Sequence, residues 1–131
     1  MKGLDTNILV RYFVQDDPAQ GEKATQFIEK TVAEGENCFL NNIVLCELVW
    51  VLESAYGYSK AEIADLLEKV LKTSIFYFEN KDAVWWSLRE YKKSKADFSD
   101  CLISRQNQTH GCGETVSFDK GVKGVEGFVV L

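Results

Sequence analysis

The clearest pattern of hydrophobic and polar positions lies between residues 59 and 71, where apolar residues recur at helical spacing. The apolar positions at i, i+3, i+4, i+7 and i+8 are Ile63, Leu66, Leu67, Val70 and Leu71. Directly before them, Ser59 and Glu62 form the Ser-x-x-Glu capping box with which many helices begin. The sequence therefore predicts an amphipathic helix that begins after Ser59.

Four further helices are predicted from polar residues that can cap a helix N-terminus. The caps are Asp17 followed by Pro18, the pair Asn41-Asn42, Asn80 and Asp97. Proline directly after a cap is favoured because its ring fixes the backbone angle that the first helical residue needs. The first, second and fourth of these helices are expected to end near residues 34, 55 and 109, and the third carries apolar residues up to Tyr91.

Short apolar segments between the helices predict strands. They comprise residues 2–5, 38–40, 75–78, 115–118 and 128–131. Strands that alternate with helices favour a parallel sheet covered by helices on both faces. We therefore expect an α/β fold, a three-layer α/β/α sandwich with a parallel sheet of four or five strands. Ligands should bind beyond the carboxyl ends of these strands.

The length of 131 residues, with 46% hydrophobic positions, indicates a single domain over residues 1–131. No apolar run approaches the ~18 residues of a membrane span, and Asp5 stands too early for a signal peptide, so we expect a cytoplasmic protein. The cysteines contain no Cys-x-x-Cys pair, which favours reduced thiols over a disulfide or a zinc site. They are Cys38, Cys46, Cys101 and Cys112.

Glu47 is the only charged residue in the apolar run from residue 43 to residue 52. A helix that is apolar nearly all round is buried, and a buried carboxylate is costly unless it is paired or bound to a metal. An ion pair with an arginine such as Arg105, or a neutral glutamic acid, would also explain it. We predict that Glu47 is a metal ligand.

Asp5 ends the first predicted strand and Asp119 follows the strand of residues 115–118, and the carboxyl ends of strands are where catalytic acids of parallel sheets lie. Asp5 could instead cap the following helix, and Asp119 could be a turn residue before Lys-Gly. Asp97 and Asp100 lie three positions apart, on one face of the helix that Asp97 can cap. Capping explains Asp97 better than Asp100.

Several carboxylates in one pocket would repel one another strongly without a cation. With one histidine and no paired thiols, an oxygen-only ligand set favours Mg²⁺ or Mn²⁺ over zinc. Such a site is typical of phosphodiester hydrolysis. The net charge of −5 does not exclude nucleic acid, because setting five acids aside leaves 15, which equals the 15 lysines and arginines.

The chain resembles PIN-domain nucleases, in particular VapC-type toxins of bacterial and archaeal toxin–antitoxin pairs. Four segments carry the resemblance: Leu4–Leu9 (LDTNIL), Glu47–Leu52 (ELVWVL), Ala96–Ile103 (ADFSDCLI) and Ser117–Lys120 (SFDK). The pair Asn41-Asn42 departs from the serine that the family often has before the Glu-bearing helix. Asparagine caps a helix equally well.

The resemblance implies a PIN-like fold and an endoribonuclease that cleaves single-stranded RNA and leaves 5′-phosphate ends. It implies that Mg²⁺ or Mn²⁺ is held by Asp5, Glu47, Asp100 and Asp119, with Asp97 as an additional acid. Thr6, Asn7 and Ser117 are implied to support these ligands. The family also implies a homodimer and inhibition by a small antitoxin.

Candidate RNA-binding cations are Arg11, Lys92, Lys95 and Lys120, although runs of charge are usually solvated helix faces. Two other functions remain open from the residues: a metal-dependent phosphatase acting on small phosphoesters, and a non-catalytic domain that binds RNA or a partner. Trp50, Trp85 and Trp86 could form a partner surface, but we expect them to pack in the core.

Overall fold

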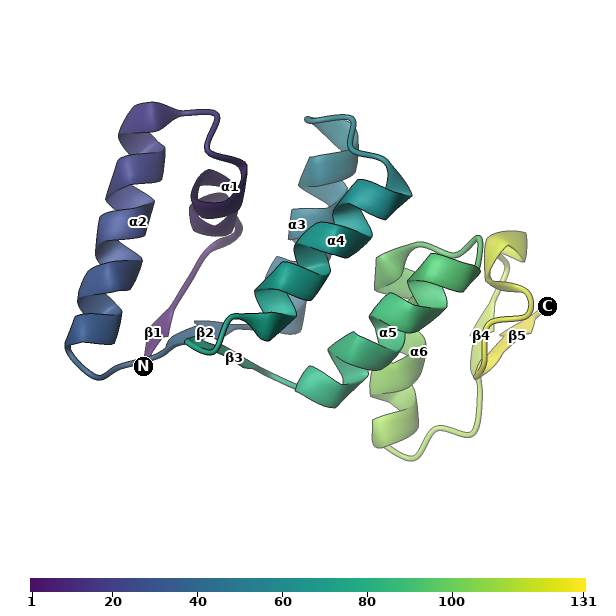
Figure 1. The fold of residues 1–131 in the computed structure, drawn as a ribbon. Helices are drawn as coiled ribbons and strands as arrows, with labels where there is room; N and C mark the ends of the chain where they lie inside the picture. Colours follow the sequence, from purple (N-terminus) through teal and green to yellow (C-terminus); the bar gives the residue numbers. More distant parts are fainter. The chain divides into compact units, whose positions relative to one another are not determined.

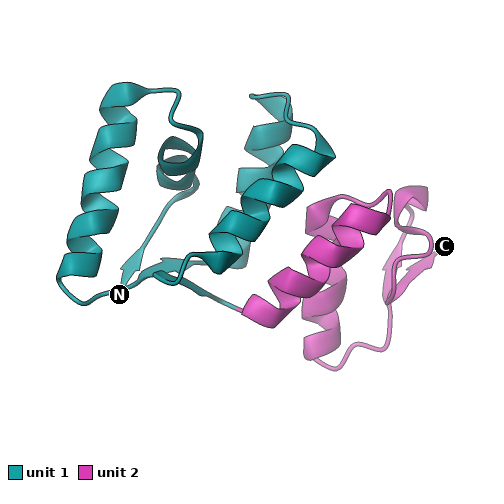
Figure 2. Ribbon diagram, in the orientation of Figure 1, with its two compact units in different colours: residues 1–79 teal, residues 80–131 magenta.

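Helices and short strands alternate along the chain, as the hydrophobic pattern predicts (Figure 1). The structure is a computed structural model that describes residues 1–131. Its contacts divide the chain into two compact units, Met1–Glu79 and Asn80–Leu131 (Figure 2). None of its helices combines the length and the apolar character that crossing a membrane requires.

The first unit contains a three-stranded parallel sheet and four helices. The strands pair in the order β1-β2-β3, with Lys2 opposite Cys38 and Cys38 opposite Phe76. The elements are β1 (Lys2–Gly3), α1 (Thr6–Val14), α2 (Pro18–Ala33), β2 (Cys38–Leu40), α3 (Asn42–Ser54), α4 (Lys60–Lys72) and β3 (Phe76–Phe78). Each helix pair links one strand to the next, so the carboxyl ends of the strands share one edge of the sheet.

The helix caps of the first unit lie at the positions that the sequence indicates. The side chain of Asp17 accepts a hydrogen bond from the backbone N–H of Gln20, and Asn41 accepts one from Val44. Ser59 and Glu62 form the complete capping box. Fully buried aliphatic side chains from all the helices and from β2 make the core of this unit. The largest are Leu9, Ile28, Leu40, Leu45, Leu48, Leu52, Ile63, Leu67 and Leu71.

The second unit contains two packed helices and a parallel pair of strands. Its elements are α5 (Lys81–Lys93), α6 (Phe98–Thr109), β4 (Thr115–Ser117), a 3-10 turn η1 (Lys120–Val122) and β5 (Phe128–Val130). The buried rings of Tyr91 and Phe98 meet edge to face, with centroids 6.2 Å apart. The buried Ser104 Oγ donates a hydrogen bond to the carbonyl of Glu126, which ties α6 to the start of β5.

The structure confirms the α/β class and the parallel pairing, and it corrects how the five strands are distributed. They form one sheet of three strands and one of two, rather than one sheet of four or five. The strands are two or three residues long and therefore offer few ladder positions, which keeps both sheets small.

All four cysteines are free thiols, as the sequence predicts. Cys38 and Cys101 are buried, whereas Cys112 is exposed. Cys46 is only half-buried, because the helix that carries it has an open face. Burial raises the pKa of the Cys46 thiol to about 11, so it stays protonated at neutral pH.

Candidate active site

Asp5 connects β1 to α1 and occupies the N-cap position of this helix. Its Oδ1 accepts a hydrogen bond from the backbone N–H of Thr6 at 2.7 Å. The capping role considered from the sequence is therefore present in the structure. It uses one carboxylate oxygen and leaves Oδ2 without a partner inside the chain, so capping and a second role are compatible.

Glu47 lies on α3, and the structure corrects the expectation that this helix is buried on all sides. Ile43 is 70% exposed and Trp50 is 67% exposed, and Glu47 on the same helix is exposed as well. The apolar run therefore includes residues on the face of α3 that packs in the core and residues on the face that is open to solvent. The core-packing expectation is wrong for Trp50, whereas Trp85 and Trp86 are half-buried.

The hydrogen-bond partner of Glu47 is a hydroxyl group rather than an arginine. Thr6 Oγ1 donates to Glu47 Oε1 at 3.4 Å. Arg105, the arginine considered as an ion-pair partner, donates to Gln108 and lies 5.1 Å from the ring centre of Trp86. Thr6 is itself buried and contacts both acids, since its backbone N–H bonds Asp5.

Asp5 and Glu47 line one cavity of about 620 Å³ in the first unit. Thr6 and Asn7, the residues expected to support the acids, line the same cavity, as does Arg11. The start of α1 and the middle of α3 thus bring together two acids that are 42 residues apart in the sequence.

The second unit gathers the other three candidate acids within electrostatic range of one another. Burial, partly offset by a hydrogen bond to the backbone of Asp97, raises the pKa of the Asp100 carboxyl, and the charges of Asp97 and Asp119 raise it further. Asp97 occupies the N-cap position of α6, but its side chain makes no capping hydrogen bond. Capping therefore does not account for the Asp97 side chain, contrary to the interpretation from the sequence.

Asp119 directly follows Phe118 at the carboxyl end of β4 and precedes η1. Its Oδ1 accepts a hydrogen bond from the backbone N–H of Gly121 at 2.7 Å. Its own backbone N–H donates to Ser117 Oγ at 3.0 Å. Ser117 therefore fixes the backbone of Asp119, a role consistent with the supporting position expected for it.

The predicted cations fall into two kinds. Lys92, Lys95 and Lys120 are exposed and make no ion pair. Arg11 is half-buried and forms an ion pair with Asp16 at 3.1 Å. Tyr56 also accepts from Arg11, and sequence reasoning missed both of these partners. No local pattern connects Tyr56 with Arg11, because the contact is made only when α1 and α3 pack.

The donor chemistry fits a hard divalent cation in the cavity of the first unit. Its acids offer carboxylate oxygens, and the cavity has room for water molecules, which Mg²⁺ usually retains. Within neither unit do three His, Cys, Asp or Glu side chains stand in an arrangement that could hold a metal by themselves. The cavity therefore fits an ion that binds few side chains and keeps several water ligands.

The chain is similar to known proteins over most of its length. The model of the PIN domain family matches residues 3–127, a span that includes all five candidate acids and extends into both units. A VapC ribonuclease of Aquifex aeolicus (strain VF5) is 32% identical over 123 residues, which cover 94% of this chain and 90% of that protein. The chain therefore belongs to the PIN-domain family, among its VapC-type members.

Proposed function

We propose that the protein is a metal-dependent endoribonuclease that cleaves single-stranded regions of RNA. The observation that carries the proposal is the shared cavity of Asp5 and Glu47, joined through Thr6, in a chain of the PIN-domain family. PIN-domain nucleases generally need divalent metal ions, and the relative from Aquifex aeolicus is named a ribonuclease.

The proposed metal ligands are Asp5, Glu47, Asp100 and Asp119, with Asp97 as an additional acid. Asp5 supports this assignment because Oδ2 has no partner inside the chain. Asp100 supports it because its carboxyl group is partly buried beside two other acids. A bound cation relieves such repulsion and favours the ionised carboxylates.

Bound Mg²⁺ or Mn²⁺ would supply a water activated for attack on phosphorus and would stabilise the charge that develops there. The chain's own residues orient the acids. Thr6 holds Asp5 with its backbone N–H and Glu47 with its hydroxyl, so both carboxylates keep one orientation. Ser117 holds the backbone of Asp119 at the end of β4. Fixed ligands of this kind avoid reorganisation during the reaction.

The proposed RNA contacts are Arg11 and the exposed Lys92, Lys95 and Lys120. Arg11 lines the cavity of the acids, whereas the three lysines make no ion pair and are available to phosphate groups. As a VapC-type member, the protein is further proposed to be the toxin of a type II toxin–antitoxin pair, to form a homodimer and to bind a small antitoxin protein.

The decisive experiment incubates the protein with a mixed RNA pool in Mg²⁺ or in Mn²⁺, with EDTA and the Asp5→Asn variant as controls. Cleavage is expected with either ion and should be lost in both controls, while circular dichroism shows that Asp5→Asn remains folded. Undiminished cleavage by Asp5→Asn in EDTA would overturn the proposed mechanism.

The two other functions are separated by parallel assays. A phosphatase would release phosphate from p-nitrophenyl phosphate under the conditions in which RNA remains intact. A non-catalytic binding domain would retain RNA on a filter and leave its length unchanged in both metals. We expect neither outcome, because the chain belongs to the PIN-domain family, its relative from Aquifex aeolicus is named a ribonuclease, and Arg11 lines the same cavity as the acids.

A further inference from the structure

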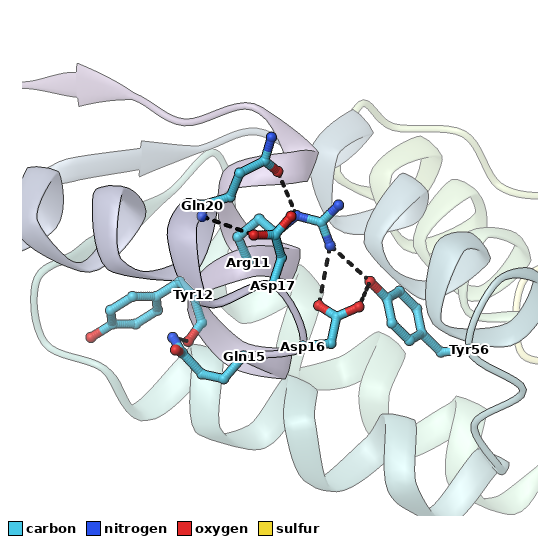
Figure 3. A network of polar contacts seen from close by, with 7 residues as sticks. All are labelled: Arg11, Tyr12, Gln15, Asp16, Asp17, Gln20 and Tyr56. Atoms are coloured by element: carbon cyan, nitrogen blue, oxygen red, sulfur yellow. Dashed lines mark hydrogen bonds and ion pairs between the residues drawn. The ribbon is translucent and has the colours of Figure 1, made fainter.

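Arg11, which lines the carboxylate cavity, is the centre of a polar network (Figure 3). Its Nε donates to Gln20 Oε1 at 2.7 Å, and its Nη1 donates to Asp16 Oδ1 and to the Tyr56 hydroxyl, both at 3.1 Å. The Tyr56 hydroxyl in turn donates to Asp16 Oδ2 at 2.8 Å. The remaining terminal nitrogen, Nη2, makes no hydrogen bond inside the chain.

The network draws on segments that are far apart in the sequence. Arg11 lies in the last turn of α1, Gln20 lies on α2, and Tyr56 follows the end of α3. A free arginine side chain loses about 2 kcal/mol of rotamer entropy when it is fixed. Because folding already fixes Arg11, a ligand that binds Nη2 does not bear most of this cost.

Stability alone is a weak reason for such a network. The ion pair between Arg11 and Asp16 is partly exposed to water, and pairs of this kind contribute little to folding. The hydrogen bond from Tyr56 lowers the pKa of Asp16, so the carboxylate keeps its charge and its hold on Arg11 in mildly acidic solution. The network therefore fixes the orientation of Arg11, which lines the same cavity as Asp5 and Glu47 and keeps Nη2 as a free donor.

A second cavity, of about 360 Å³, lies beside the first and shares Asn7 and Arg11 with it. Its remaining wall comes from α1 and α2. Lys23 adds a second cation, no acid lines this cavity, and Ile8 and Ala24 give it an apolar side. Phe27 on the same wall is 45% exposed, so its ring is accessible.

These features together match a nucleotide. Two cations, Arg11 and Lys23, line a cavity that no acid lines, and Arg11 keeps Nη2 free although Nη1 is paired with Asp16, which favours a phosphate group. An accessible aromatic ring beside it can stack on a base. An apolar peptide would use the ring, but it would gain nothing from two cations or from continuity with the carboxylate cavity.

We infer that the cavity between α1 and α2 binds the nucleotide that flanks the scissile phosphate, with Arg11 and Lys23 on its phosphate and Phe27 against its base. Tyr56 and Asp16 act as positioning residues that aim Arg11. The inference rests on the proposed ribonuclease function, and it names a second subsite of that function.

The test measures the affinity of a fluorescein-labelled single-stranded RNA decamer in Mg²⁺, using Asp5→Asn protein as the background so that the RNA stays intact. Arg11→Gln, Lys23→Gln and Phe27→Leu are each expected to weaken binding by roughly 5- to 10-fold. For Lys23→Gln, the slope of log affinity against log salt should decrease by about 1. Lys30→Gln, on the far part of α2 and outside both cavities, is the matched control and should change neither quantity.

Kinetics in the unmodified background test the positioning residues. Tyr56→Phe keeps the ring but removes both hydrogen bonds of the hydroxyl. It is expected to raise KM by about 3- to 5-fold with kcat within about 2-fold, because the loss concerns binding rather than chemistry. A fall in kcat with an unchanged KM would contradict a positioning role.

The outcomes separate the inference from the proposed function. If the parent protein cleaves RNA but all three cavity variants bind the decamer like Lys30→Gln, the nucleotide subsite is refuted. The cavity between α1 and α2 would then be assigned to a peptide partner. If the parent protein neither binds nor cleaves RNA, the proposed function fails first. Thermal unfolding of each variant shows whether an affinity change reflects loss of fold.

Discussion

The acids of the two units are controlled by different interactions. In the first unit, hydrogen bonds from Thr6 hold Asp5 and Glu47 beside an open cavity. In the second unit, Asp100 is partly buried near Asp97 and Asp119, and the pKa of its carboxyl is raised. Asp97 lacks even the capping hydrogen bond that its position offers.

The two units therefore represent two different arrangements of acids that can bind a cation. Hydrogen bonding fixes the orientation of acids at little electrostatic cost, whereas crowding of acids leaves repulsion that a cation can relieve. A substitution in the first unit should therefore affect local structure as well as chemistry. A substitution of Asp100 should abolish cleavage. It should also stabilise the folded state, because it removes a partly buried charge near two other acids.

The largest expected effect is on cleavage, and it should be the same in both units. Asp5→Asn and Asp100→Asn are each expected to reduce kcat on RNA by on the order of 100-fold or more, as loss of one preorganised electrostatic group does. Asp17→Asn is the matched control, since Asp17 also caps a helix but lies outside the acid groups. Cleavage by Asp100→Asn at the rate of Asp17→Asn would remove the second unit from the mechanism.

The next largest effect concerns the stability of the second unit. Gly127 has a φ of +90°, and a Cβ there would clash with Ser104 Oγ, which donates a hydrogen bond to the carbonyl of Glu126. Gly127→Ala is expected to lower the free energy of unfolding by about 2 to 3 kcal/mol, measured by urea denaturation.

Gly124→Ala is the control for the backbone part of this effect. Gly124 has a φ of +89° and open space around its Cβ position. Gly124→Ala should therefore lower the free energy of unfolding only by the cost of the left-handed backbone conformation, about 1 kcal/mol. Equal losses for the two variants would mean that the close approach of β5 to α6 contributes nothing.

A smaller effect tests how far Asp5 is structural. Asp5→Ala removes the cap of α1 and is expected to cost about 1 kcal/mol of unfolding free energy, whereas Asp5→Asn keeps a capping side chain and should cost only a few tenths. Both variants should lose cleavage equally. If Asp5→Ala were as stable as Asp5→Asn, the hydrogen bond to Thr6 would not support α1.

The smallest effect should have the opposite sign and should depend on pH. The raised pKa of Asp100 means that the folded state binds its proton more tightly than the unfolded state does. Stability is therefore lost as pH rises through the folded-state pKa, and the full penalty applies at neutral pH. In EDTA, Asp100→Asn is expected to unfold at a higher temperature than the parent protein at pH 7.

The gain should shrink as the pH falls through the raised folded-state pKa toward the ordinary aspartate value of 3.8, and it should be absent below that value, where the parent carboxyl is protonated in both states. Thermal scans at several pH values between 3.5 and 7 measure this. A gain that is constant over that range would show that charge is not its cause.

Most of the local structure of this protein could be predicted from its sequence. The caps at Asp17, Asn41, Ser59 and Asn80 lie where they were predicted, because a cap depends on residues within one helical turn. The alternation of helices and strands followed from periodicity for the same reason. The pattern of four acids was sufficient to indicate the family, which the comparisons confirm.

Which helix faces are open to solvent, and which distant side chains contact one another, depends on how the elements pack. Glu47 was predicted in a buried helix, but α3 exposes one side, and a run of nine apolar residues around Glu47 does not indicate which of them face a neighbour. The Arg11 network and the division of the strands into two sheets likewise depend on elements separated by tens of residues. Burial and long-range contacts are properties of packing, and local sequence does not contain them.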